Sequence, residues 1–296
     1  MPADAIRATA PFEVHGESSE IPPMVQPREV ETEGAMIRYR LWEQAGPDAP
    51  GLLFAHGFRA HSRWWDHIAP AFAADYRVAA LDFSGFGDSD WRDTYSAHSF
   101  ARELLAVADH ARLTPVTIVA HSFGGTPAAH AAYMAPEKVR RVVIIDSRML
   151  IAPVPEPEAF ELSKVGRVNH VFDDLETLVR RFRLLPPVEA VAPGLLDYIA
   201  RHSVRPVEGG WAWKFDARLD PQLVGDPQRL APPDIRPPLD FIYGSRSDVA
   251  PPALARTIAA YYGREPMFIA DANHHLPLEC PEALIDALRG LLIAAA

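Results

Sequence analysis

Short apolar runs alternate with amphipathic segments along most of this chain. From residue 28 onward, residues 28–33 and 36–43 are strand-like and flank Gly34, so we expect them to pair as a hairpin. Residues 52–55 are apolar throughout, which is typical of a buried parallel strand. Further strand-like runs lie at 78–81, 116–119, 142–145, 239–243 and 267–269. This order predicts an α/β fold with a mostly parallel, doubly wound central sheet.

Helical periodicity fills the intervals between these strands. Apolar residues recur on one helical face at positions 100, 104, 107, 108 and 111, and again at 284, 288, 291 and 292. An alanine-rich segment follows Ser122 and is expected to continue to about Ala135, because Pro136 ends it.

The alternation stops between Ser147 and Pro238, where proline-rich sequence and short amphipathic pieces replace it. Such a segment is too long for a loop, so we expect an inserted helical cap. The predicted organisation is therefore an N-terminal arm (1–27), a first core part (28–147), the helical cap (148–237) and a second core part (238–296).

Charge and composition exclude several classes of partner. The formal net charge of −10 and a pI near 5.6 disfavour nucleic acid and anionic membrane surfaces. Residues 1–24 lack the apolar core of a secretory signal, and no stretch is apolar for long enough to span a bilayer, so we expect a cytoplasmic protein. The single cysteine, Cys280, is expected to be structural.

Ser122 carries the strongest chemical signal. It lies in Ala-His-Ser-Phe-Gly-Gly, directly after a β-branched strand and before the alanine-rich helix. A sharp turn of this kind needs small residues two positions to either side of its apex, and Ala120 and Gly124 satisfy that need. A serine hydroxyl beside the free N–H groups of a helix start is a candidate nucleophile. The alternative is an ordinary serine N-cap.

Other strand ends carry the groups that acyl transfer requires. Asp248 follows the strand at 239–243, His274 follows the strand at 267–269, and His56-Gly57-Phe58 follows the strand at 52–55. A base, a carboxylate that orients it and donors for an oxyanion are needed besides the nucleophile.

On these motifs, and on the glycine-rich stretch at 82–89, the chain resembles the α/β-hydrolase superfamily from about Arg28 to its C-terminus. The resemblance implies a triad of Ser122, His274 and Asp248, with the backbone N–H groups of Phe58 and Phe123 forming the oxyanion hole. The chain departs from the usual pattern at Ala120 and Asn273, where glycine is common.

Two positions in this triad have rivals. The rival base is His275, which adjoins His274. Similar enzymes usually have an acidic residue five positions after the catalytic histidine, and Glu279 lies five positions after His274, which favours His274. Asp146, at the end of the strand at 142–145, is the rival carboxylate, whereas Asp248 fits the position more common among similar enzymes. Haloalkane dehalogenases and soluble epoxide hydrolases of similar fold carry an aspartate nucleophile, so a serine makes either reaction unexpected.

These features together predict a serine hydrolase that cleaves a carboxylic ester or lactone. Trp211 and Trp213, near the return of the cap, are candidate substrate-binding residues and suggest a small, apolar, ester-like substrate. We expect neither a metal nor an organic cofactor. The alternatives are a carbon–carbon bond hydrolase of a ring-cleavage product and a non-catalytic ligand receptor on the same fold.

Overall fold

A central β-sheet organises the computed structural model, which describes residues 6–7, 25–151, 170–188, 191–219, 222–223, 226 and 229–293. Within these residues the sheet has nine strands in the order β1-β11-β10-β7-β6-β4-β5-β3-β2, with β2 and β3 antiparallel to their neighbours and the rest parallel. The strands are β1 (Ile6–Arg7), β2 (Val25–Thr32), β3 (Ala35–Trp42), β4 (Gly51–Ala55), β5 (Arg77–Leu81), β6 (Val116–His121), β7 (Val139–Ile145), β10 (Leu239–Gly244) and β11 (Met267–Ala270).

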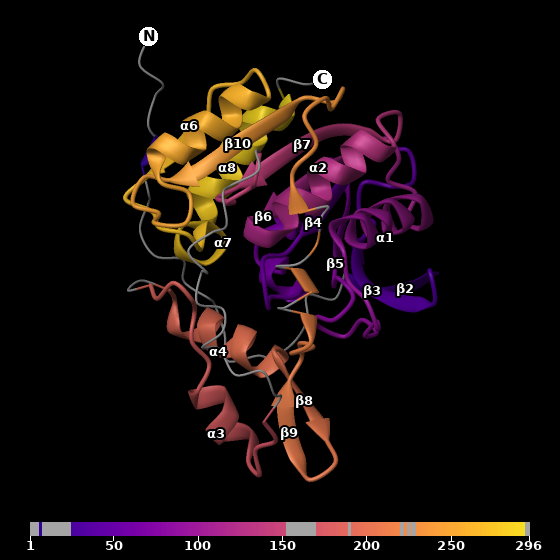
Figure 1. Ribbon diagram of the computed structural model, residues 1–296, viewed down its shortest axis with the longest axis vertical. Coiled ribbons are helices and arrows are strands. Elements are labelled where there is room, and N and C mark those ends of the chain that lie inside the picture. The colour runs from indigo at the N-terminus through magenta and orange to yellow at the C-terminus, as the bar shows by residue number, and fades with distance from the viewer. Residues whose placement is uncertain are drawn as a thin grey trace.

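Helices cover both faces of this sheet (Figure 1). One core cluster packs α1 (Ala97–His110), α2 (Gly125–Met134) and α6 (Pro252–Tyr261) against the sheet. A second cluster, on the other face, includes α7 (Leu276–Glu279), α8 (Pro281–Ile293) and the 3-10 turns η1 (Ser62–Trp65) and η2 (Ala69–Ala71). The predicted doubly wound α/β fold is confirmed.

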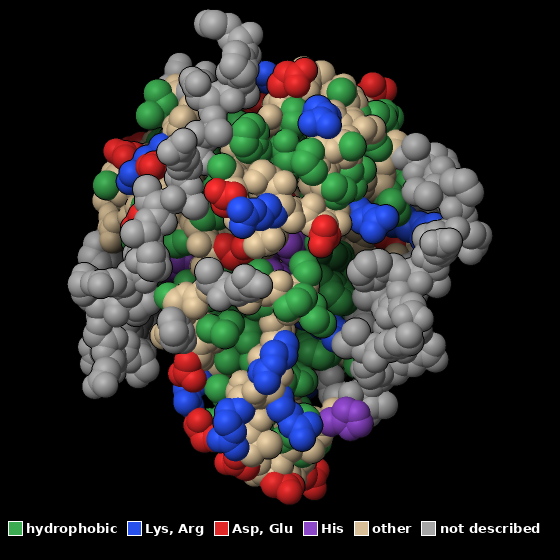
Figure 2. Space-filling model, turned by 90° about the vertical axis from the view of Figure 1, so that its left-hand side faces the viewer, with side chains coloured by type: hydrophobic (Ala, Val, Ile, Leu, Met, Phe, Trp, Pro, Cys, Tyr) green, Lys and Arg blue, Asp and Glu red, His purple; other side chains and the backbone are tan. Residues whose placement is uncertain are grey.

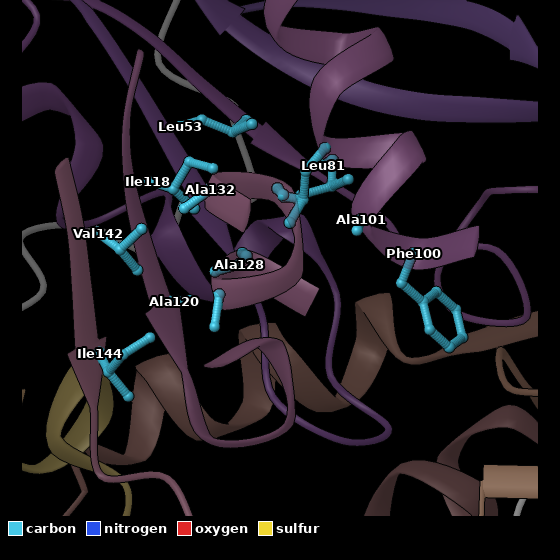
Figure 3. Close-up of a cluster of buried hydrophobic side chains, with 14 of the residues drawn as sticks. Leu53, Leu81, Phe100, Ala101, Ile118, Ala120, Ala128, Ala132, Val142 and Ile144 are labelled. Carbon is cyan, nitrogen blue, oxygen red and sulfur yellow. The ribbon is translucent and has the colours of Figure 1, made fainter. Parts of the chain in front are cut away.

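The alternation of side chains along each strand explains the two cores. In β4, Leu53 and Ala55 belong to the cluster with α1 and α2, whereas Leu52 and Phe54 belong to the opposite cluster. Every residue of β4 is buried, because both faces of the sheet are covered. Figure 3 shows the first cluster, in which side chains of β4, β5, β6 and β7 meet Phe100 and Ala101 of α1 and two alanines of α2.

The segment between β7 and β10 lies beyond one end of the sheet, at the bottom of Figure 1. Its described elements are α3 (Leu175–Arg180), α4 (Pro193–His202) and the antiparallel hairpin β8 (Val204–Val207) and β9 (Gly210–Trp213). The segment predicted as a helical cap therefore also contains strands. Gly209 and Gly210 both adopt positive φ at the hairpin turn, which allows the two strands to pair after so short a connection.

Described strand residues lie before as well as after the predicted boundary at residue 28. Strand β2 starts at Val25, and β1 pairs in parallel with β11 at the far edge of the sheet. Most of the predicted arm at 1–27 lies outside the described residues. In the part of the chain that is described, no helix has the length and apolarity needed to cross a bilayer.

Candidate active site

Ser122 stands at a sharp turn between β6 and α2. Its φ of 51° lies in the left-handed region, which a non-glycine residue adopts at a cost. The 3-10 turn η3 (Ser122–Gly124) leads directly into α2. A Cβ added to Gly124 would lie 2.9 Å from the carbonyl oxygen of His56 and 3.2 Å from Cβ of Ala55, so the turn requires glycine there. The turn therefore packs tightly against the end of β4.

Asp146 follows the neighbouring strand at the same edge of the sheet. His121 and Ile145 are register partners in β6 and β7, so Ser122 and Asp146 are the next residues of two paired strands. Asp146 also adopts a positive φ, 45°, and its side chain is fully buried. Ser122 and Asp146, which directly follow these two strands, therefore both have strained backbones. Such strain is typical of residues held in place for a function.

The carboxylate of Asp146 accepts three hydrogen bonds. Nδ1–H of His274 donates to Oδ1 at 2.8 Å, the hydroxyl of Ser247 donates to Oδ1 at 2.6 Å, and the backbone N–H of Gly244 donates to Oδ2 at 2.8 Å. A carboxylate can only accept, so it fixes the proton of His274 on Nδ1 and leaves Nε2 free to accept. That tautomer is the one a general base requires.

The loop that carries His274 is held by Glu279. Its carboxylate accepts hydrogen bonds from the backbone N–H of Asn273 at 3.1 Å, from the Asn273 side chain at 2.9 Å and from the backbone N–H of His275 at 2.7 Å. His274 therefore lies between two anchored residues. Because Glu279 lies five positions after His274, it can reach back to the residues on either side of His274.

The loop after β4 is fixed by His56, which is fully buried. Nδ1–H of His56 donates to the carbonyl oxygen of Gly57 at 2.7 Å, and Nε2 accepts the backbone N–H of Phe83 at 3.1 Å. Burial lowers the pKa of His56, so the ring is neutral and can fill both roles at pH 7. A Cβ on Gly57 would lie 3.3 Å from Cβ of Ser122, so this loop directly adjoins the serine.

Asp82 joins the glycine-rich stretch at 82–89 to the same loop. Its Oδ1 accepts the backbone N–H of Ser62 at 2.6 Å, and its Oδ2 accepts that of Asp88 at 2.8 Å. The stretch after β5 therefore holds the loop after β4 in position rather than presenting a chemical group of its own.

Aromatic rings surround the backbone positions expected to form an oxyanion hole. The rings of Phe58 and Phe123 lie 6.0 Å apart at 62°, and Phe86 contacts both at 5.8 Å and 5.6 Å. Phe123 is in the first turn after Ser122, where backbone N–H groups have no intrahelical acceptor. The serine therefore borders an apolar, aromatic wall.

The chain matches a known family model and known structures. The family model described as "alpha/beta hydrolase fold" matches residues 50–185. A solved structure of E-2-(acetamidomethylene)succinate hydrolase superposes with a TM-score of 0.77, covering 91% of this chain and 99% of that one at 21% identity. These matches support membership of the α/β-hydrolase superfamily. The resemblance inferred from the motifs is thereby confirmed.

Two curated relatives of this α/β-hydrolase cover most of its length. Lipase LipV of Mycobacterium tuberculosis (strain ATCC 25618 / H37Rv) is 28% identical over 238 residues, which are 77% of this chain and 80% of LipV. Pimeloyl-[acyl-carrier protein] methyl ester esterase of Neisseria meningitidis serogroup C / serotype 2a (strain ATCC 700532 / DSM 15464 / FAM18) is 23% identical over 239 residues, covering 78% of this chain and 89% of the esterase. The family and these relatives identify the α/β-hydrolase as an enzyme.

The expected pairing of Asp248 with His274 needs correction. Asp248 is exposed, and the carboxylate that holds Nδ1 of His274 is that of Asp146. The loop after β10 turns its Gly244 N–H and its Ser247 hydroxyl toward Asp146, so this loop supports the carboxylate and does not supply it. A sequence signal did favour Asp146, because it directly follows its strand whereas Asp248 lies four residues beyond Gly244.

The tryptophans expected in the substrate site contact other residues of the inserted segment. Trp211 forms a backbone bridge with Phe172, and the ring of Trp213 lies 6.1 Å from that of Phe182. Phe215, a few residues later, bridges Phe86 of the core. Phe215 therefore brings the insertion to the aromatic wall, and the substrate-binding role of Trp211 and Trp213 stays a prediction.

Three buried histidines meet beside the serine. Among the described residues, His121, His274 and His275 form a group in which one ring nitrogen of each histidine lies within 4.8 Å of the other two, as a candidate metal site would need. Burial lowers the pKa of His121 well below its usual value and that of His275 to about 3. His275 and His121 are therefore neutral near pH 7.

Proposed function

We propose that this α/β-hydrolase cleaves a carboxylic ester or lactone through an acyl-Ser122 intermediate. The observation that carries the proposal is the hydrogen bond between the buried Asp146 carboxylate and Nδ1 of His274, at the sheet edge where Ser122 is strained. Named relatives that act on lipids or methyl esters support the ester class.

In this mechanism Nε2 of His274 takes the proton of Ser122 as Oγ attacks the carbonyl carbon. Asp146 stabilises the resulting imidazolium, and the N–H groups of Phe58 and Phe123 stabilise the oxyanion. The imidazolium then protonates the leaving alcohol, which departs and leaves the acyl-serine. Water, activated by the same histidine, attacks the acyl-serine and releases the acid with Ser122 restored.

The acyl chain of the substrate, which is attached to the ester carbonyl carbon, is expected to be apolar. Phe58, Phe86, Phe123 and Phe215 gather beside the serine, and burying apolar substrate surface against them is worth about 25 cal/mol per Å². The guanidinium of Arg59 lies over the rings of Phe58 and Phe215, with its Cζ 5.3 Å and 4.3 Å from their centroids. The proposed substrate is therefore an ester whose acyl part is hydrophobic.

Covalent labelling tests the nucleophile. A fluorophosphonate is expected to form one adduct per chain, located on Ser122 by mass spectrometry of proteolytic peptides, because the probe mimics the tetrahedral intermediate. Thermal unfolding before labelling prevents adduct formation and serves as the control. A folded protein without an adduct on Ser122 would rule out the acyl-enzyme mechanism.

The neighbouring histidine gives a second test. His275→Gln is expected to keep kcat/KM for a short p-nitrophenyl ester within about threefold of wild type, the small effect of a change outside the reacting groups. The glutamine amide can still donate to the carbonyl of Pro186, which Nε2–H of His275 does at 3.1 Å. A loss of several orders of magnitude would instead make His275 the base.

A further inference from the structure

The three buried histidines introduced above, His121, His274 and His275, form what we call the histidine cluster. Their ring centroids lie 4.9 Å apart for His121 and His274, 4.9 Å for His274 and His275 and 6.1 Å for His121 and His275. Each is at least nine-tenths buried. In Figure 2, histidine side chains show as small patches near mid-height and as one larger patch lower down. The proposed mechanism uses one of the three rings and leaves two unexplained.

Each ring already directs one nitrogen at an oxygen that can only accept. Nε2 of His121 faces the carbonyl oxygen of His274 at 2.9 Å, Nδ1 of His274 faces Asp146, and Nε2 of His275 faces the carbonyl oxygen of Pro186. Each of these nitrogens must carry the ring's proton. The second nitrogen of every ring therefore offers a lone pair.

Two of these lone pairs accept no hydrogen bond from the described residues. Nδ1 of His121 and Nδ1 of His275 are buried, and neither has a hydrogen-bond partner among the described residues. A buried nitrogen without a partner is unfavourable, so a water molecule or a bound ion is expected to satisfy it. A histidine that donates one N–H to a carbonyl or carboxylate while its other nitrogen is free is also the usual arrangement around a bound zinc ion.

We propose that the histidine cluster binds a divalent transition metal ion, with Zn²⁺ as the representative, and that the ion inhibits the enzyme. Imidazole nitrogens select Zn²⁺ and Cu²⁺ over Mg²⁺ and Ca²⁺. A metal on Nε2 of His274 removes the lone pair that would accept the serine proton, so the hydrolysis cannot start. The inhibitory half of this inference rests on the proposed function, whereas metal binding does not.

The spacing favours a reversible inhibitor over a permanent cofactor. Zn–N bonds of about 2.0–2.1 Å place two ligand nitrogens of a tetrahedral site about 3.4 Å apart. The cluster spans up to 4.8 Å, so its rings must move together when the ion enters. That movement costs free energy and keeps the affinity below that of a preformed zinc site. The fully buried Asp146 carboxylate, hydrogen-bonded to one of the rings, favours the added positive charge.

Isothermal titration with Zn²⁺, after treatment with a chelator, tests binding without any use of catalysis. Wild-type protein is expected to bind one ion per chain, and His275→Gln to raise the Kd by about 100-fold, the effect of losing a group that supports a metal. His170→Gln removes an exposed histidine outside the cluster and is expected to leave the Kd unchanged. Ser122→Ala is expected to bind Zn²⁺ as wild type does.

Esterase assays at rising Zn²⁺ test the inhibition. Wild-type activity is expected to fall over the concentrations at which titration shows binding and to return with a chelator, while His275→Gln needs about 100-fold more Zn²⁺. Cu²⁺ bound to the wild-type protein is expected to show nitrogen hyperfine splitting in its EPR spectrum, which needs no variant. Absence of that splitting, or a Kd that His275→Gln leaves unchanged, overturns the site. Zn²⁺ binding without inhibition overturns the inhibitory role. Esterase activity that survives in Ser122→Ala overturns the proposed function but leaves the Zn²⁺ binding measured by titration unaffected.

Discussion

Ser122→Ala and His274→Ala are each expected to lower kcat/KM for a p-nitrophenyl ester by about 10⁶-fold, and the double variant by no more than either alone. Removing the hydroxyl removes the atom that forms the acyl bond, and removing the imidazole leaves that hydroxyl protonated. Because both changes disable one step, their effects are not additive, as in other triad hydrolases. A residual rate above that of water would come from binding and oxyanion donors.

Steady-state kinetics on all three variants measure this, with circular dichroism to establish folding. Alanine keeps the Cβ of Ser122, so the strained turn at φ 51° is not altered. Thr126→Ala, which removes another hydroxyl from the start of α2, is the matched control and should keep near wild-type activity. Additive losses in the double variant would show that Ser122 and His274 act in separate steps, which the mechanism does not allow.

The sheet could be predicted from sequence because each strand carries its own signal. Five consecutive buried residues in β4 and the β-branched run in β6 reflect a sheet covered on both faces, and that burial favours apolar side chains on both faces of each strand. The hairpin β8–β9 could not be predicted in the same way. Its four-residue strands are half-buried, and Pro206 interrupts the pattern, so no periodicity distinguishes them from a loop.

The candidate site shows a similar division. Ser122 and the loop after β4 lie at the same edge of the sheet, as predicted, because the carboxyl ends of parallel strands meet at one edge. The choice between Asp146 and Asp248 could not be settled from sequence, because both follow strands at that edge. The hydrogen bond between His274 and Asp146 decides it, and that contact joins residues 128 positions apart in the chain. Contacts within the insertion, such as Trp213 with Phe182, were equally outside what a single sequence shows.

Asp146→Asn is expected to lower kcat/KM by about 10⁴-fold, the scale found when a triad carboxylate becomes an amide. The structure gives the reason. The backbone N–H of Gly244 is a fixed donor at 2.8 Å, so the amide oxygen of the asparagine must take the place of Oδ2. The amide NH₂ then faces His274 and forces the ring's proton from Nδ1 to Nε2. His274 in that tautomer cannot accept the proton of Ser122.

Nitrogen-15 NMR of the histidine rings distinguishes this explanation from unfolding, because His274 should shift from the Nδ1–H to the Nε2–H form while the other resonances persist. Asp248→Asn makes the same chemical change on an exposed carboxylate and is the matched control, expected to stay within about twofold of wild type. The hydroxyl of Ser247 loses its acceptor in Asp146→Asn, but its Oγ still accepts the backbone N–H groups of Val249 and Ala250 at 3.2 Å, and these two bonds hold the loop after β10. If Asp248→Asn proves the more damaging change, Asp146 is a structural carboxylate and the proposed triad is wrong.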